Sequence, residues 1–139
     1  GYTPLTVYTG GSERMRIDTS GNVLVTNSGG GLGYGTGSGG TVTQATSKST
    51  AVTLNKPTGQ ITTNAAALAA GAEVVFTFNN SLVSIVDIPL VVAITNSNYT
   101  AQVGGVGSGL FNIVLKNRSG GSLSDAVVIN FAIIKGATT

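Results

Sequence analysis

Short stretches of alternating apolar and polar residues, separated by glycine-rich breaks, constrain the fold of this chain most strongly. In Glu73–Asn79, the apolar side chains of Val74, Phe76 and Phe78 occupy every second position. A period of two places such side chains on one face of a β-strand, whereas a helix needs a period near 3.6. Ala126–Ile134 has the same pattern, with Val127, Ile129, Phe131 and Ile133 on one face and Val128, Ala132 and Ile134 on the other. The sequence therefore predicts an all-β protein.

Residues 41–139 hold roughly eight strand-like segments with frequent turn signals, which favours a β-sandwich or jelly roll. The further segments are Thr41–Ala45, Ala51–Asn55, Gln60–Thr63, Leu82–Val86, Leu90–Thr95, Tyr99–Val103 and Leu110–Lys116. Leu82–Val86 and Leu90–Thr95 are apolar on both faces, so we expect both faces to be covered. Asn64–Ala70 has helical propensity, and we expect a helical turn or a loop with Leu68 buried.

The first 31 residues predict a β-rich stem. Thr3–Thr9, Arg14–Asp18 and Val23–Val25 have the pattern of strands joined by glycine turns. Strands this short are not stable alone in water, and identical chains around a threefold axis would give them partners. Residues 32–40 form a Gly-rich connector, either a flexible linker or a close crossing of backbones. The predicted organisation is a stem over 1–31, this connector, and a C-terminal β-sandwich domain over 41–139, in a trimer.

The composition excludes most catalytic chemistry. The chain has no His and no Cys, so a Ser-His-Asp triad, a Cys nucleophile and a His-ligated or Cys-ligated zinc site are all excluded. A pair of carboxylates is the remaining route to catalysis, and we expect the acids to be solvated in loops or at strand ends instead. These acids are Glu13, Asp18, Glu73, Asp87 and Asp125. We therefore predict no enzymatic activity, no catalytic residues, no cofactor and no metal.

Charged residues are unusually sparse. They make up 9% of the chain, with a net charge of +2, against roughly 25% in typical soluble domains. Few charges mean little repulsion between neighbouring copies, which suits side-by-side association of chains. Proteins that bind nucleic acid concentrate positive charge on one face, whereas Arg14 with Arg16 and Lys116 with Arg118 form only small clusters. No nucleic-acid partner is predicted.

Candidate binding residues lie in three polar loops, Asn79–Leu82, Asn96–Ala101 and Asn117–Ser122. Tyr99 is flanked by amides and hydroxyls, a combination that stacks on sugars and hydrogen-bonds to them. The alternative, that Tyr99 only packs at a strand edge, stays open. The residues predicted to contact a receptor are Tyr99, Asn98, Asn96, Asn80 and Arg118. Tyr34 is a second aromatic candidate. Phe111 could lie in the core or at an interface, and we favour the core.

Two segments resemble bacteriophage structural proteins. GGSERMRIDTSGNVLV, residues 10–25, resembles a segment common in the distal parts of phage tail fibres and tailspikes. There, a similar run leads into a self-cleaving chaperone domain, which the following residues of this sequence do not resemble. GYGTGSGGTVTQATSKSTAVTLNKPTGQIT, residues 33–62, together with AALAAG and INFAIIKGATT, resembles a module at the C-terminus of many phage and prophage structural proteins. The resemblance implies a virion surface protein with a trimeric, β-rich tip, and it transfers no catalytic residues.

The first hypothesis is a virion protein, the distal module of a tail fibre or tailspike, which is exposed to the host cell surface. It would form a homotrimer, contact other virion proteins and bind a host cell-surface polysaccharide or outer-membrane receptor. The second hypothesis is a capsid decoration or head-fibre protein without specific receptor binding. A third, a glycan-degrading spike, would need clustered acids on a parallel β-helix, and the sequence indicates neither.

Overall fold

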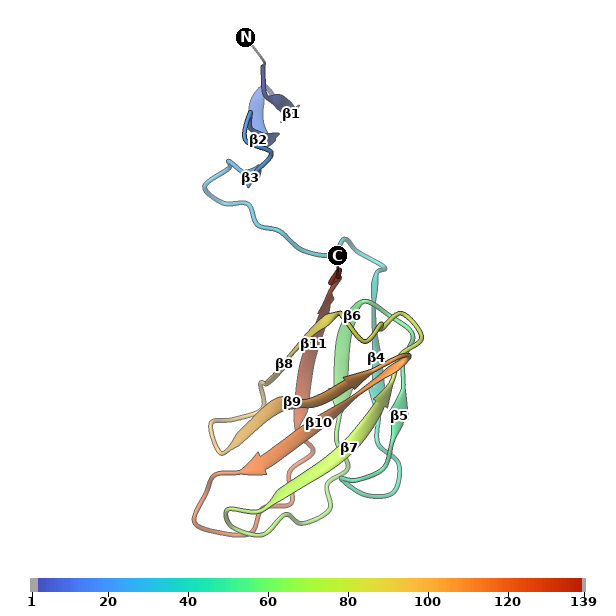
Figure 1. The fold of residues 1–139 in the computed structure, drawn as a ribbon. Coiled ribbons are helices and arrows are strands. Elements are labelled where there is room, and N and C mark those ends of the chain that lie inside the picture. The colour runs from blue at the N-terminus through green and yellow to red at the C-terminus, as the bar shows by residue number, and fades with distance from the viewer. Residues whose placement is uncertain (1–2, 139) are drawn as a thin grey trace. The chain divides into compact units, whose positions relative to one another are not determined.

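The computed structural model describes residues 3–138, and these residues form strands and loops but no helix. The prediction of an all-β protein is confirmed. The chain divides into two compact units, Gly1–Tyr34 and Gly35–Thr139. One three-stranded sheet lies in the first unit and two four-stranded sheets lie in the second (Figure 1). In the described part of the chain, no helix is long and apolar enough to cross a membrane.

The first unit is an antiparallel meander of β1 (Leu5–Thr9), β2 (Ser12–Ile17) and β3 (Val23–Val25). Gly10 and Gly11 connect β1 to β2 with φ angles of 57° and 76°, a conformation that glycine adopts without steric cost. In the turn before β3, Asp18 Oδ1 accepts hydrogen bonds of 2.9 Å from the backbone N–H groups of Ser20 and Asn22. Every side chain in residues 3–34 is exposed or only partly buried, so this unit has no core of its own.

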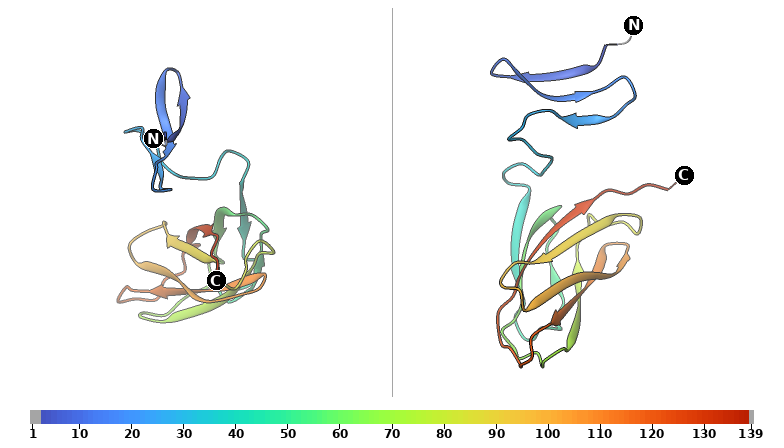
Figure 2. Two further views of the ribbon diagram at one scale, coloured as in Figure 1. Left: turned by 45° about the horizontal axis from the view of Figure 1, so that its top comes forward. Right: turned by 90° about the vertical axis from the view of Figure 1, so that its left-hand side faces the viewer.

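The second unit consists of two four-stranded sheets that share one hydrophobic core. The first sheet has the order β5-β7-β10-β9 and the second has the order β4-β6-β11-β8 (Figure 2). The strands are β4 (Gly39–Thr43), β5 (Val52–Thr53), β6 (Thr58–Thr62), β7 (Glu73–Asn79), β8 (Ile88–Ala93), β9 (Tyr99–Gly107), β10 (Leu110–Asn117) and β11 (Val128–Ile134). β4 pairs with β6 and β5 with β7 in parallel, and the other neighbours are antiparallel.

Three phenylalanine rings join the two sheets. Phe78 on β7 meets Phe111 on β10 with ring centroids 5.0 Å apart, and Phe131 on β11 with centroids 4.8 Å apart, both edge to face. This geometry places the positive edge of one ring against the negative face of the next. The predicted inner face of the last strand is confirmed, because Val127, Ile129, Phe131 and Ile133 are all buried. The expected core position of Phe111 is confirmed as well.

Two local expectations differ from the structure. Leu82–Val86, predicted as a strand, is a series of turns, because side chains at both ends bind its backbone. Leu82 N–H donates to Asn80 Oδ1 at 3.0 Å, and Ser84 N–H donates to an Asp87 carboxylate oxygen at 2.8 Å. Leu90, expected to lie in a segment covered on both faces, is 51% exposed in the single chain.

The segment Asn64–Ala70 is a loop, one of the two forms expected. Asn64 turns the backbone back on itself by accepting a hydrogen bond from Ala66 N–H at 2.8 Å. Leu68 is buried as expected and forms a two-hydrogen-bond bridge with Leu123. A helix would leave Leu68 unable to make this bridge, so the long-range pairing outweighs the local helical propensity.

Candidate functional site

Four loops gather at one end of the second unit, which we term the loop end. They are residues 44–51 after β4, 63–72 after β6, 94–98 after β8 and 118–127 after β10. The register places them together, because β4, β6, β8 and β10 all run toward this end (Figure 1). The chain enters the unit through β4 at the opposite end, so the loop end faces away from that connection.

Three of the five predicted contact residues meet at the loop end. Arg118 N–H donates to the Asn98 carbonyl oxygen at 2.7 Å, which joins the loop after β10 to the loop after β8. Asn98 N–H donates in turn to Asn96 Oδ1 at 2.9 Å, and Asn96 Nδ2 lies 3.5 Å from an Asp125 carboxylate oxygen. Asn96, Asn98 and Arg118 are exposed, so the loop end carries two amide groups and a guanidinium group on linked loops at the surface.

The other two predicted contacts are buried. Tyr99 is 3% exposed at the start of β9, which supports packing, the alternative interpretation of this residue. Its hydroxyl approaches Asp125 but has no well-formed hydrogen bond within residues 3–138, and burial raises the pKa of Tyr99. Asn80 is fully buried at the opposite end, where its Nδ2 donates to the Lys56 carbonyl oxygen at 2.7 Å. The expectation that Asn80 forms part of a surface is therefore corrected.

A buried lysine ties three of the loops together. Lys48 is only 3% exposed, and its Nζ donates to the carbonyl oxygens of Asn64 and Asp125, each at 2.6 Å. Burial lowers the pKa of Lys48, and the nearby charge of Asp125 opposes that effect. Sequence analysis did not single out Lys48, because a lysine among Ser and Thr has the pattern of a solvated loop residue.

Asn117, the last residue of β10, holds two of these loops together, residues 63–72 and 118–127. This fully buried side chain donates through Nδ2 to the carbonyl oxygens of Leu68, Ala69 and Gly121 at 2.9, 3.2 and 2.8 Å. Its Oδ1 accepts from Ser119 N–H at 2.9 Å and from Ser119 Oγ at 2.7 Å. Buried polar groups with all their hydrogen bonds made hold a unique conformation. The exposed side chains of the loop end therefore lie on loops that buried hydrogen bonds hold in one conformation.

One of the five acidic residues is buried, whereas the other four are exposed or partly exposed. Asp87 has no exposed side-chain surface and forms an ion pair with Lys135, which corrects the expectation of a solvated acid. Glu73 pairs with Lys116 at 3.0 Å and Glu13 pairs with Arg16 at 2.5 Å. Residues 3–138 contain no group of three or more Asp and Glu residues that could hold a metal ion. Tyr34, the weaker aromatic candidate, is 47% exposed in the first unit.

The Asp87 ion pair gives the fold an expected pH dependence. The Lys135 ammonium, followed by the N–H groups of Ser84 and Gly136, holds the pKa of Asp87 well below its ordinary value. A depressed pKa stabilises the fold above the unfolded value of about 3.9, and this contribution is lost as the pH falls toward the folded value. The thermal unfolding temperature should therefore fall as the pH drops below about 4. In Asp87→Asn, the unfolding temperature should depend less on pH over the same range. An Asp87→Asn profile parallel to the wild type would contradict this assignment, and Glu73→Gln, at a half-exposed pair, serves as the control.

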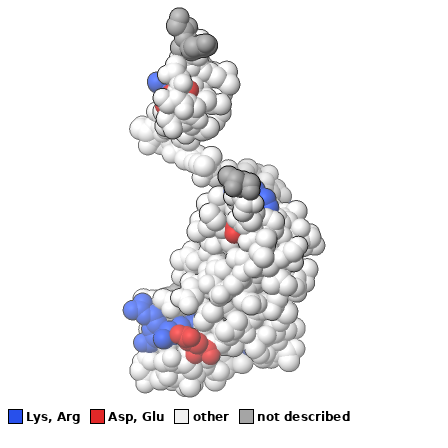
Figure 3. All heavy atoms as spheres, in the orientation of Figure 1, with Lys and Arg blue, Asp and Glu red and all other residues white. Residues whose placement is uncertain are grey.

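The surface offers hydrogen bonds rather than a strong field. Figure 3 shows that charged side chains are sparse on the face in view, and that the largest group, of both signs, lies toward the loop end. Such a surface suits hydroxyl-rich ligands, which both donate and accept hydrogen bonds. Comparison of the chain with protein-family models, with curated proteins and with solved structures gives no match.

Proposed function

We propose that this chain is the distal module of a bacteriophage tail fibre or tailspike, which trimerises and binds a host cell-surface polysaccharide. The observation that carries the proposal is the loop end, where exposed Asn96, Asn98 and Arg118 stand on a buried polar support. This surface lies opposite the point where the chain enters the unit, as a terminal binding surface requires. The resemblance of residues 10–25 and 33–62 to phage structural proteins supplies the virion context.

The first unit supports assembly with further copies. Leu5 is 63% exposed and Val23 is 60% exposed, and no side chain in residues 3–34 is buried. A three-stranded sheet without a hydrophobic face covered by other groups is marginal in water. Three copies of this segment, each covering its neighbour's apolar side chains, would form a stem. The low charge of the chain leaves little repulsion to oppose that association.

In this proposal the second unit is a β-sandwich that displays binding loops. Two four-stranded sheets with one shared core form the architecture in which loops cluster at the ends and carry recognition while the sheets stay rigid. Three such units in one trimer would present three equivalent loop ends. Binding at several weak sites together exceeds the affinity of one site by factors of about 10²–10⁴ when the geometry allows simultaneous contact.

The test measures binding of the full 139-residue chain to a panel of immobilised bacterial O-antigen and capsular polysaccharides. Arg118→Ala is expected to weaken binding about tenfold, because a charge-assisted hydrogen bond to sugar hydroxyls is worth ~1.5 kcal/mol or more. Arg14→Ala removes the same charge from the first unit, where its Nε donates to Thr9 Oγ1 at 3.0 Å at the surface, and should bind like the wild type. Equal weakening by both variants would indicate nonspecific charge attraction instead.

The capsid-decoration alternative predicts a different outcome. A chain that binds none of the polysaccharides but attaches to purified phage heads would overturn receptor recognition. In that case, variants at the loop end would leave attachment unchanged unless the same surface faced the shell. The polysaccharide panel and the head-binding measurement together decide between the two functions.

A further inference from the structure

The exposed apolar side chains of the second unit are concentrated on one strand. Apart from Val75, every large apolar side chain that is exposed in residues 35–138 lies within residues 82–94 or at Ile134. On β8, Ile88, Leu90 and Val92 point outward and are 56%, 51% and 54% exposed. β8 is also an edge strand of its sheet. We term this outward surface of β8 and β11 the β8 face.

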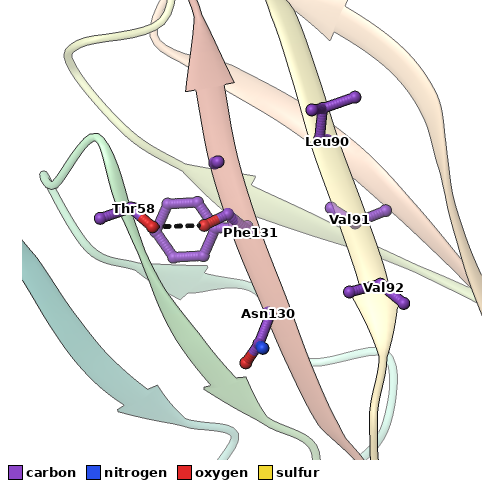
Figure 4. A pocket seen from close by; sticks show the side chains of 7 residues that line it. Thr58, Leu90, Val91, Val92, Asn130 and Phe131 are labelled. Carbon is purple, nitrogen blue, oxygen red and sulfur yellow. Dashed lines mark hydrogen bonds between the residues drawn. The ribbon is translucent and has the colours of Figure 1, made fainter. Parts of the chain in front are cut away.

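The strand register makes the β8 face continuous. Ile88 pairs with Ile134 of β11, Leu90 with Ala132 and Val92 with Asn130. The small Ala132 lies between Leu90 of β8 and Thr58 of β6, which leaves a hollow of about 290 Å³ above it (Figure 4). The lining is mostly apolar, with Leu90, Val91, Val92, Phe131 and Ala132 beside Thr58 and Asn130. Such a hollow fits an aliphatic side chain from outside the unit.

The strands of the sheet that contains β8 also carry no charged side chain. β4, β6, β8 and β11 contain no Asp, Glu, Lys or Arg, whereas the other sheet has Glu73 and Lys116. An uncharged apolar surface has no groups that could pair with a highly charged partner. When it is buried against another apolar surface, no charged group is left without a partner. Interfaces between permanent copies of one chain have this composition.

The exposure of the β8 face fits a subunit contact. Its large side chains Ile88, Leu90, Val92 and Ile134 are each 51–56% exposed and are brought together by the pairing of β8 with β11. A contiguous exposed apolar patch of this kind marks an interaction site. The first unit independently requires further copies of the chain, because none of its described side chains is buried. A homotrimer would satisfy both surfaces in one assembly.

We infer that the β8 face is the contact between copies of this chain, with Leu90, Val92 and Ile134 at its centre and the hollow over Ala132 receiving an aliphatic side chain of a second copy. This inference rests on the proposed trimeric assembly and specifies the surface that forms it. The loop end remains outside the contact, so that all copies can bind at once.

Charge insertion tests the contact. Leu90→Glu combined with Val92→Glu should raise the concentration at which the trimer dissociates about tenfold or more, as measured by light scattering over a dilution series. Val75→Glu, on the outer face of the other sheet, is the matched control and should dissociate at the wild-type concentration. A double variant that also dissociates at the wild-type concentration would overturn the inference while leaving the trimer itself intact. A monomeric wild-type chain would overturn intrinsic trimerisation together with this contact.

Thiol protection tests the same contact without adding charge. The natural chain has no cysteine, so Val92→Cys and Val75→Cys each carry a single thiol. The two positions are 54% and 51% exposed in the single chain, which makes their intrinsic accessibility nearly equal. In the trimer, the thiol at position 92 should react with a disulfide reagent at least tenfold more slowly than the thiol at position 75. Equal rates in a confirmed trimer would overturn the inference even if the charged variant fails to fold.

Discussion

Phe78→Ala is expected to lower the free energy of unfolding of the second unit by about 4 kcal/mol, the usual cost of removing a fully buried aromatic ring. Phe78 has no exposed surface, and its ring touches Phe111 in its own sheet and Phe131 in the opposite sheet. The substitution therefore removes buried apolar area, leaves a cavity and breaks two edge-to-face contacts that join the sheets.

Chemical denaturation followed by circular dichroism measures this effect. Val75→Ala on the same strand is the control, because Val75 is 51% exposed and truncating it leaves no cavity. Phe78→Leu should retain much of the stability, since it refills most of the volume without the ring contacts. A Phe78→Ala variant as stable as Val75→Ala would mean that the two sheets do not depend on this cluster.

Asn117→Ala is expected to destabilise the loop end by about 3 kcal/mol, because it removes several buried hydrogen bonds that contribute ~0.5–1.5 kcal/mol each. The carbonyl oxygens of Leu68, Ala69 and Gly121 each lose one donor and keep another, whereas Ser119 N–H loses its acceptor. The loops 63–72 and 118–127 should then exchange their amide hydrogens much faster than β7 and β10. Hydrogen exchange with mass spectrometry measures that difference.

Asn117→Asp sharpens this test. The carboxylate keeps the acceptor for Ser119 but turns a second oxygen toward three carbonyl groups, so this variant should be at least as unstable as Asn117→Ala. Asn98→Ala, which removes an exposed amide at the same end, should leave the loops protected. Wild-type protection in Asn117→Asp would show that the buried amide does not hold the loops. If the loop end binds polysaccharide as proposed, Asn117→Ala should also weaken that binding, although Arg118 itself is unchanged.

The pattern of side chains predicted the strands whose two faces differ. Glu73–Asn79 and Val23–Val25 match β7 and β3 residue for residue, and the buried face of the last strand was recognised from its alternation. A period of two is a local property of the sequence, so it can be recognised without knowing the partner strand. Leu82–Val86 has no such contrast between faces. Its apolar residues fit a strand equally well, and the turn is set by Asn80 and Asp87 through contacts that local pattern does not contain.

The candidate site was predictable only in its exposed part. The polar composition of two loops identified Asn96, Asn98 and Arg118 as surface residues. The structure joins the loop of Arg118 to that of Asn98, although the two are distant in sequence. Tyr99 and Asn80 have the same local surroundings, yet they are buried. Burial of a polar residue in a loop depends on which other loops close over it, and sequence pattern alone does not give that packing.

The amino-acid sequence by itself determined that this chain is all-β and that it carries little charge. Its composition also excludes catalysis by histidine or cysteine, because the absence of a residue type excludes every mechanism that needs it. The tertiary structure decided which polar residues support the loops and which are exposed. Lys48 and Asn117 are buried with backbone carbonyl groups around their side-chain nitrogens, whereas Arg118 is exposed. Those carbonyl groups come from distant segments, and only the pairing of strands brings them within hydrogen-bonding distance.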